Sequence, residues 1–302
     1  MVEIVAEGAY SVDSDGLETW AKNPDAVFRP ASTLKFITGY LAFLWVDDVD
    51  ALLCEAIQSD KVGGTSARLQ AGDVMTLRDM LYGLMLPSGN DAAHCIARTV
   101  GQVMLDSEGA TGDPKARFIA EMNTTVAGWG WEGVNIGSPS GYPDSTSYIT
   151  AKQLVDIGRH VYLAGSPIIE VAGTMHHEST VISGPNPRVI AYDNTFNRDG
   201  AVKFPEHIAG KTGSWTEGHG NLVCIWRHPD GTVHTTGILW SIPAAQRFVD
   251  MRRIMNEVIF GAVQSKITIN GQRPVSMQCE EMQAVAMFLG TEDGQQTIWA
   301  RQ

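Results

Sequence analysis

Hydrophobic and polar residues alternate in two groups of short segments, one near the start of the chain and one in its last third. Such alternation puts apolar side chains on one face of an extended segment and is typical of β-strands. The first two segments are joined by D-S-D-G, which favours a tight turn. A helix is predicted after the last strand, over residues 244–259. The predicted strands are residues 9–12, 17–21, 208–214, 221–227 and 232–240.

Between these two groups the apolar residues mostly follow a helical pattern. A largely apolar run over residues 34–45 predicts a buried helix. Thr76 is placed to cap a second, short helix, which Pro87 and Gly89 interrupt before a third begins near Asp91. The pattern therefore separates strands from helices, but it does not by itself show how they assemble.

Composition indicates a globular protein with one principal domain. A chain of 302 residues that is 44% hydrophobic can bury a large core, and one elaborate domain, alone or with a small appendage, is expected rather than two full domains. The formal charge is −12, from 34 acidic against 22 basic residues, with no block of Lys or Arg. This balance argues against nucleic acid or an anionic membrane surface as a partner.

Cysteine and histidine spacing predicts no metal site. The four cysteines include no C-x-x-C pair, and the eight histidines lack ligand spacing. A disulfide is compatible with the sequence, but no pairing can be assigned. The adjacent His176 and His177 are expected in a polar loop, and His219 at the border of a cleft. The cysteines are Cys54, Cys95, Cys224 and Cys279.

The first of three short motifs, S-T-L-K, places a hydroxyl and an amine three positions apart. Ser32 and Lys35 would project from one face of the first predicted helix, whose first turn Pro30 suits. A serine becomes a nucleophile when a neighbour takes its proton, and a lysine can do so only when neutral. Burial, the helix N-terminus and a second cation, for which Lys211 is a candidate, would lower its pKa towards about 7–8. Taken alone, the motif is better explained by a helix cap and a solvated lysine.

The second motif, S-G-N, lies in the interruption between two predicted helices. Ser88 would pass a proton to the leaving amine, while the Asn90 amide would bind the substrate backbone and orient Lys35. Taken alone, the same residues are those of an ordinary turn between helices.

The third motif, K-T-G, lies in H-I-A-G-K-T-G-S-W, which reads as a strand entering a hairpin. Gly210 and Gly213 are expected to leave one side of that strand open. An extended substrate could then dock by strand addition, with Lys211 and Thr212 meeting a terminal carboxylate. The Ser214 N–H would form an oxyanion hole with the N–H of the nucleophile. Taken alone, the motif is a surface hairpin with a solvated lysine.

In this order the three motifs resemble those of the low-molecular-weight penicillin-binding proteins, specifically the serine D-alanyl-D-alanine carboxypeptidases. The flanks are similar as well. G-L-E-T-W-A-K-N-P-D-A-V-F-R-P-A-S-T-L-K resembles the hairpin that leads to the nucleophile, and M-L-Y-G-L-M-L-P-S-G-N-D-A-A resembles the second motif. F-I-A-E-M-N and S-G-Y-P-D-S-T-S-Y-I-T-A-K resemble the middle segment. The resemblance covers about residues 9–259.

The resemblance implies a three-layer α+β fold, in which an antiparallel sheet built from both chain ends is flanked by helices. It further implies a catalytic domain over residues 1–262, with a helical subdomain over about residues 47–165 and the catalytic cleft between the two regions. Residues 263–302 would form a short C-terminal appendage that begins with a hairpin.

The resemblance also implies roles for particular residues. Two residues depart from the pattern of the family. Trp215 stands where a Thr is common. Gln153 stands where an acidic residue is usual, and this second departure puts in doubt a contact near the deacylation loop around residues 141–142. Arg247 is a weaker candidate, equally explained as a solvated arginine at a helix end. The implied catalytic residues are Ser32 as nucleophile, Lys35 as general base, and Ser88 with Asn90 as the second catalytic group. The implied substrate-binding residues are Lys211, Thr212, Gly213, Ser214 and Arg247.

The implied substrate is a peptidoglycan stem peptide ending in D-Ala-D-Ala, with β-lactams as inhibitors and no cofactor. Such a substrate lies outside the cytoplasmic membrane. The N-terminal M-V-E-I-V-A does not read as a signal peptide, and the longest apolar stretch near the C-terminus, residues 284–289, is too short to span a bilayer. An extracytoplasmic location is therefore expected from the family, with the export route left open.

Other functions of the same motifs remain alternatives. A class A-like β-lactamase would need a glutamate in a string such as E-x-x-L-N, and none occurs between residues 90 and 211. An esterase of the same fold shares the acyl-transfer chemistry. A penicillin-sensing domain would be acylated without turnover. The sequence does not separate carboxypeptidase, endopeptidase and transpeptidase activities.

Overall fold

The computed structural model describes residues 2–142, 146–198 and 206–266. Contacts divide the chain into two compact units, residues 1–258 and residues 259–302. Every site residue predicted from the sequence falls in the first unit. From residue 267 on, the predicted appendage with its hairpin and Cys279 lies outside the described residues.

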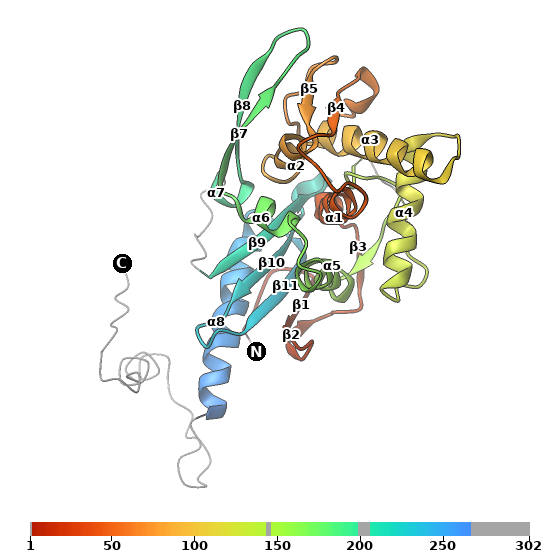
Figure 1. The fold of residues 1–302 in the computed structure, drawn as a ribbon. Coiled ribbons are helices and arrows are strands. Elements are labelled where there is room, and N and C mark those ends of the chain that lie inside the picture. The colour runs from red at the N-terminus through yellow and green to blue at the C-terminus, as the bar shows by residue number, and fades with distance from the viewer. Residues whose placement is uncertain (1, 143–145, 199–205, 267–302) are drawn as a thin grey trace. The chain divides into compact units, whose positions relative to one another are not determined.

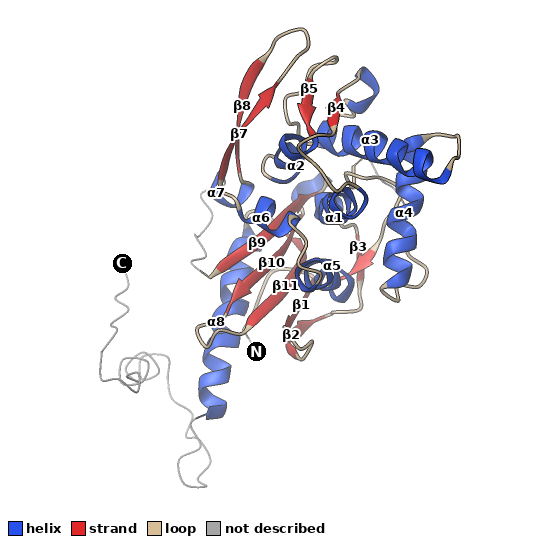
Figure 2. Cartoon of the chain, viewed as in Figure 1, coloured by secondary structure: helices blue, strands red, loops and turns tan. Residues whose placement is uncertain are grey.

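The core of the first unit is a five-stranded antiparallel sheet in the order β2-β1-β11-β10-β9. Its strands come from both ends of the unit, and Tyr10 on the first of them lies opposite Gly237 on the last. The sequence predicted all five strands to within two residues at each end. This sheet and the helices around it form the α+β arrangement of Figures 1 and 2. The strands are β1 (Gly8–Asp13), β2 (Glu18–Lys22), β9 (His207–Ser214), β10 (Gly220–Arg227) and β11 (Val233–Ser241).

Helix α1 is central to the helical region, since it packs against α2, α3, α4, α5 and α6. Its residues Phe36, Ile37 and Leu41 are fully buried, as the apolar run predicted. The helices are α1 (Lys35–Trp45), α2 (Leu77–Met85), α3 (Asn90–Glu108), α4 (Pro114–Gly128), α5 (Ala151–Leu163), α6 (Ile168–Gly173), α7 (Thr195–Arg198) and α8 (Gln246–Lys266). Short 3-10 turns are η1 (Ala31–Leu34), η2 (Gln58–Asp60) and η3 (Thr216–Gly218).

Helix α5 covers the sheet, against β1, β10 and β11, although the sequence placed it in the helical subdomain. A glycine makes this close packing possible. A Cβ atom at Gly158 would lie 2.9 Å from Thr235 and 3.1 Å from Val223, both on the sheet. The helical region between β2 and β9 is thus joined to the sheet by one continuous hydrophobic core.

Short two-stranded pairs also occur between β2 and β9, where the sequence predicted mostly helices. One correction concerns His176 and His177, which lie in the strand β7 and not in a polar loop. The His177 ring stacks on Tyr82, and its Nε2 is 3.0 Å from an oxygen of Asp79. These contacts explain why a polar sequence forms ordered structure here. The pairs are β3 (Val27–Phe28) with β6 (Ile149–Thr150), β4 (Leu53–Glu55) with β5 (Val74–Thr76), and β7 (His176–Val181) with β8 (Arg188–Asp193).

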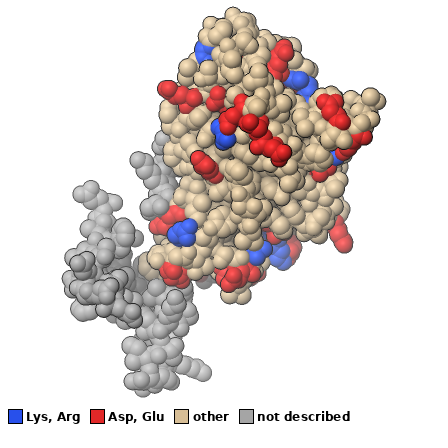
Figure 3. Space-filling model, in the orientation of Figure 1, with Lys and Arg blue, Asp and Glu red and all other residues tan. Residues whose placement is uncertain are grey.

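Acidic side chains are spread over the face seen in Figure 3, and basic ones stand among them without forming a continuous patch there. No helix in the described ranges is both long enough and apolar enough to cross a membrane.

Three cysteines are buried as free thiols: Cys54, Cys95 and Cys224. Within the same ranges, no three His, Cys, Asp or Glu side chains are arranged to hold a metal ion.

Candidate active site

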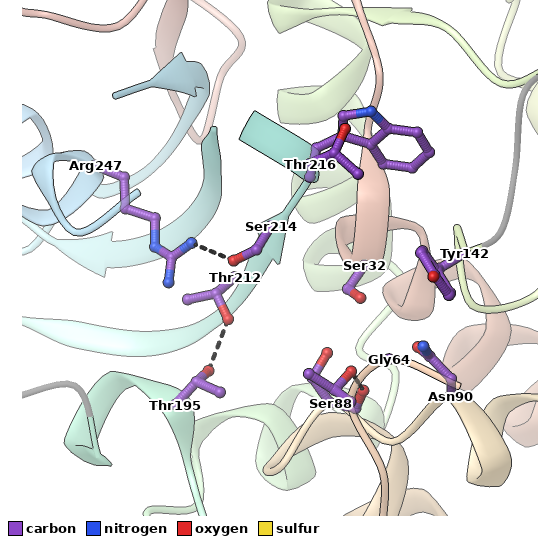
Figure 4. A pocket seen from close by; sticks show the side chains of 12 residues that line it. Ser32, Gly64, Ser88, Asn90, Tyr142, Thr195, Thr212, Ser214, Thr216 and Arg247 are labelled. Carbon is purple, nitrogen blue, oxygen red and sulfur yellow. Dashed lines mark hydrogen bonds between the residues drawn. The ribbon is translucent and has the colours of Figure 1, made fainter. Parts of the chain in front are cut away.

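The S-T-L-K motif forms the tight entry to helix α1. Ser32 lies in the 3-10 turn η1, and α1 begins at Lys35. Ala31, just before the serine, has a φ of +52°, a left-handed conformation that non-glycine residues rarely adopt. The Ser32 side chain lines a pocket of about 250 Å³, shown in Figure 4. A strained turn at a pocket is typical of a functional position.

Lys35 is fully buried beneath the pocket, and its amine is surrounded by three oxygen atoms. Nζ lies 2.7 Å from Ser32 Oγ, 2.7 Å from Asn90 Oδ1 and 3.1 Å from the backbone oxygen of Ser140. As an ammonium it donates to all three. As a neutral amine it has two N–H bonds, which Asn90 and Ser140 can accept, so that the lone pair faces the serine hydroxyl.

Burial lowers the pKa of Lys35 from 10.5 to about 7, and the nearby carboxylate of Asp91 opposes this change. The amine is therefore about half deprotonated near neutral pH. The sequence had suggested Lys211 as a second cation that helps to lower this pKa, but the lowering comes from burial. Asp91 is itself held by hydrogen bonds from the Ala67 N–H and the Ser66 hydroxyl.

The S-G-N motif forms the connection between α2 and α3, as predicted. Ser88 has a φ of +64°, which costs roughly 1–2 kcal/mol for an L-residue. Its hydroxyl lines the pocket and has no hydrogen-bond partner in the described part of the chain. The Asn90 side chain is fixed from both ends, because its Nδ2 donates to the Gly63 oxygen at 2.8 Å while Oδ1 accepts from Lys35. Asn90 thus contacts the lysine amine and is itself held in place by Gly63.

The K-T-G motif lies on β9, the edge strand of the sheet, close to the Ser32 turn. The sequence had suggested that its two glycines leave one side of the strand open, but both are closely packed. A Cβ atom at Gly213 would lie 2.9 Å from the Pro30 oxygen, and one at Gly210 would lie 2.3 Å from the Phe196 ring. Both glycines therefore allow close packing, and Gly213 lets β9 approach the turn that carries Ser32.

Thr212 and Ser214 line the pocket from β9, whereas Lys211 does not. The Lys211 side chain is 1% exposed, and its Nζ donates to the Thr212 oxygen at 2.9 Å. The Thr212 hydroxyl is 2.8 Å from that of Thr195, which also lines the pocket (Figure 4). Sequence reasoning missed Thr195, because it stands at the start of the short helix α7, outside all three motifs.

Arg247 enters the pocket from the first turn of α8 and is not a solvated arginine. It is 4% exposed, and its Nη1 donates to the Gly213 oxygen at 2.8 Å and to Ser214 Oγ at 3.0 Å. Figure 4 shows the guanidinium group beside Ser214, on the same side of the pocket as Thr212. A fixed cation and two hydroxyls in one corner can bind a carboxylate.

Aromatic side chains line the pocket opposite this corner. The rings of Tyr142 and Trp215 lie 6.5 Å apart, edge to face, and the Arg29 guanidinium lies 5.0 Å from the Trp215 ring. Trp215 thus forms part of the pocket wall. Gln153 lies away from the pocket and caps α5, with its Oε1 accepting from the Thr150 N–H. An acidic residue could make the same capping bond.

His219, expected at the cleft border, is not part of the pocket lining. Its ring stacks on Trp240 at 4.1 Å, and its Nδ1 is 3.1 Å from the Thr216 oxygen. Gly64 and Thr65, which the sequence did not single out, also line the pocket. The Thr65 hydroxyl donates to the Ser88 oxygen at 2.5 Å and so supports the second motif.

Comparison with known proteins identifies the class of enzyme. Residues 3–224 match the model of the peptidase S11 family, D-alanyl-D-alanine carboxypeptidase. The chain is 28% identical over 263 residues to a D-alanyl-D-alanine carboxypeptidase of Streptomyces sp. strain K15, covering 84% of this chain and 87% of the relative. It is 30% identical over 201 residues to one from Mycobacterium tuberculosis, covering 64% and 60%. The chain therefore belongs to the S11 family of serine D-alanyl-D-alanine carboxypeptidases.

Solved structures agree with this assignment. The crystal structure of the Streptomyces K15 DD-transpeptidase superimposes with a TM-score of 0.73 at 25% identity, over 86% of this chain and 98% of that one. A D-alanyl-D-alanine carboxypeptidase of Francisella tularensis shares the fold, with a TM-score of 0.71 at 18% identity over 84% of this chain and 70% of that one. The α+β fold that the family resemblance implied, an antiparallel sheet with helices around it, is thus confirmed.

Proposed function

We propose that this enzyme cleaves peptidoglycan stem peptides ending in D-Ala-D-Ala through an acyl-enzyme on Ser32, and that β-lactams acylate the same serine. One observation carries the proposal: the buried Lys35 amine lies 2.7 Å from both Ser32 Oγ and Asn90 Oδ1. Its pKa of about 7 leaves a substantial neutral fraction at neutral pH. A serine beside such a base is an activated nucleophile.

In the acylation step, the neutral Lys35 amine takes the proton of the Ser32 hydroxyl as Oγ attacks the carbonyl carbon of the penultimate D-Ala. The carbonyl oxygen gains negative charge, which the N–H groups of Ser32 and Ser214 would stabilise. The C–N bond then breaks as the Ser88 hydroxyl gives its proton to the departing amine and receives the proton that Lys35 had taken, so that both groups return to their starting states. Terminal D-alanine leaves, and water later hydrolyses the Ser32 ester.

Substrate binding would use the edge of β9 and the polar corner of the pocket. Thr212, Ser214 and Arg247 face the pocket there, and the buried Lys211 is bonded to the backbone behind them. The terminal carboxylate of the peptide fits this corner, while its backbone can pair with the edge strand. Since such peptides occur in the cell wall, we propose that the enzyme acts outside the cytoplasmic membrane.

The proposed function predicts release of free D-alanine from a stem pentapeptide. The parent protein should release D-alanine, and a labelled penicillin should form an adduct whose mass maps to Ser32. Ser32→Ala should show neither product, since among the described residues the Ser32 hydroxyl is the one that is hydrogen-bonded to the Lys35 amine. Stable penicillin acylation without D-alanine release would instead indicate a sensor. An adduct that persists in Ser32→Ala would overturn the assignment of the nucleophile.

The carboxylate corner makes a separate prediction. Replacing the terminal carboxylate by an amide should lower kcat/KM of the parent about ten- to hundredfold, because a charge-assisted contact of about 1.5–3 kcal/mol is lost. In Arg247→Ala, replacing the carboxylate by the amide should lower kcat/KM much less than in the parent. The comparison works as a double-mutant cycle, because enzyme and substrate each lose one partner of the same contact. Lys211→Ala, tested in parallel, measures how much the buried charge contributes. Equal cleavage of acid and amide by the parent would exclude recognition of the carboxylate.

A further inference from the structure

A loop behind the pocket, residues 138–142, is bound to the catalytic helix by its own backbone. Thr38 Oγ1 donates to the Pro139 oxygen at 2.6 Å, and Lys35 Nζ donates to the Ser140 oxygen at 3.1 Å. Gly141 follows with a φ of +73°, and a Cβ atom there would lie 2.0 Å from the Ala31 oxygen. The loop thus has no room to shift toward the turn that carries Ser32.

The Ser140 side chain is connected in turn to a buried histidine. His94 lies one helical turn after Asn90 on α3, is 7% exposed, and has Nε2 3.3 Å from Ser140 Oγ. Ser140 Oγ donates to the Tyr142 oxygen at 2.5 Å and accepts from the Tyr142 N–H at 3.1 Å. Ser138 Oγ also lies 3.1 Å from Ser140 Oγ, but its hydroxyl can donate to the Tyr142 oxygen at 3.3 Å. The second acceptor site of Ser140 Oγ can then take an N–H from the Nε2–H tautomer of His94.

The surroundings keep His94 uncharged. Burial lowers its pKa to about 4; Lys115 on α4 and Lys35 on α1 act in the same direction, while a hydrogen bond to the Tyr142 backbone and the carboxylate of Asp60 oppose them. Its Nδ1 is buried and has no hydrogen-bond partner in the described ranges. His94 is therefore a neutral donor throughout the pH range in which Lys35 loses its proton.

We propose that His94 is a positioning residue: through the Ser140 hydroxyl it holds the Ser140 carbonyl against the Lys35 amine. Two acceptors, the Ser140 carbonyl and Asn90 Oδ1, then take the two N–H bonds of the neutral lysine and leave its lone pair directed at Ser32. Since α3 supplies both Asn90 and His94, one helix fixes both acceptors. This inference rests on the proposed role of Lys35 as the general base.

Three substitutions at this position separate hydrogen bonding from packing. His94→Leu fills the site but donates nothing, so acylation by labelled penicillin should slow about three- to tenfold. The pH at which the acylation rate is half-maximal should also rise, because a looser loop admits water to Lys35 and so raises the lysine pKa. His94→Gln places an amide N–H near the position of Nε2 and should restore both the rate and the midpoint. His94→Asn, whose amide is one methylene shorter, should behave like His94→Leu.

A second buried histidine provides the matched control. His234 on β11 is 5% exposed and also has a buried Nδ1 without a partner in the described ranges, but it stacks on Trp226 away from the pocket lining. His234→Leu should leave the acylation rate and midpoint unchanged. Parental kinetics in His94→Leu, or equal losses in His94→Gln and His94→Leu that follow thermal stability, would overturn the positioning role. Absence of any Ser32 adduct in the parent would instead overturn the proposed function.

Discussion

Lys35→Ala is expected to lower the rate of acylation by penicillin, and of D-alanine release, by about 100- to 10,000-fold, the usual contribution of a general base. The described part of the chain places no replacement beside Ser32, since the other groups bound to this amine, Asn90 Oδ1 and the Ser140 carbonyl, are weak bases. Lys35→Arg should fail as well, because a guanidinium remains protonated at all relevant pH values. Rapid-mixing measurements with labelled penicillin would give the rate constants.

The stability of a third variant shows whether such losses arise from unfolding. Lowering the Lys35 pKa from 10.5 to about 7 costs the folded state about 4–5 kcal/mol at pH 7, because the unfolded chain binds the proton more tightly. This cost falls as pH rises from about 7 to 10.5. Lys35→Met keeps most of the volume without the amine, so it should unfold at a higher temperature than the parent yet remain inactive. Near-parental acylation by Lys35→Met would show that another base is used.

The sequence predicted that Ser32, Lys35 and Asn90 lie together, because motif spacing encodes contacts within one element or turn. Ser32 and Lys35 are three positions apart, and Asn90 opens the helix whose start Pro87 and Gly89 define. The five strands were also predictable, since each alternates over at least four residues. Pairing between chain ends, which joins β1 to β11, came only from the resemblance to a family.

The contacts that sequence reasoning missed join residues of different elements. Ser140 reaches Lys35 across 105 positions, and Thr195 meets Thr212 although neither spacing nor composition marks it. Gly210 and Gly213 were interpreted as leaving a strand open, whereas they permit close packing against Phe196 and Pro30 respectively. A glycine alone does not reveal which neighbour approaches it, so such errors follow from reading one strand without its surroundings.

Asn90→Asp is the sharpest test of how the base is tuned. The parental acylation rate should rise with pH around a midpoint near 7, where Lys35 loses its proton. A carboxylate in place of Oδ1 would lie about 2.7 Å from the lysine nitrogen and should raise the lysine pKa by about one to three units. Near pH 7 the neutral fraction would then fall from about one half to roughly one in a hundred.

Acylation by Asn90→Asp should accordingly be about 50-fold slower than that of the parent at pH 7, and much of the difference should disappear by pH 10. Asn90→Ala is the control, because it removes the acceptor for Lys35 and the donor to the Gly63 oxygen without adding charge. The acylation rate of Asn90→Ala should be reduced at every pH. Unlike that of Asn90→Asp, it should not recover as the pH rises towards 10. A pH profile of Asn90→Asp with its midpoint still near 7 would show that the Lys35 proton does not control acylation.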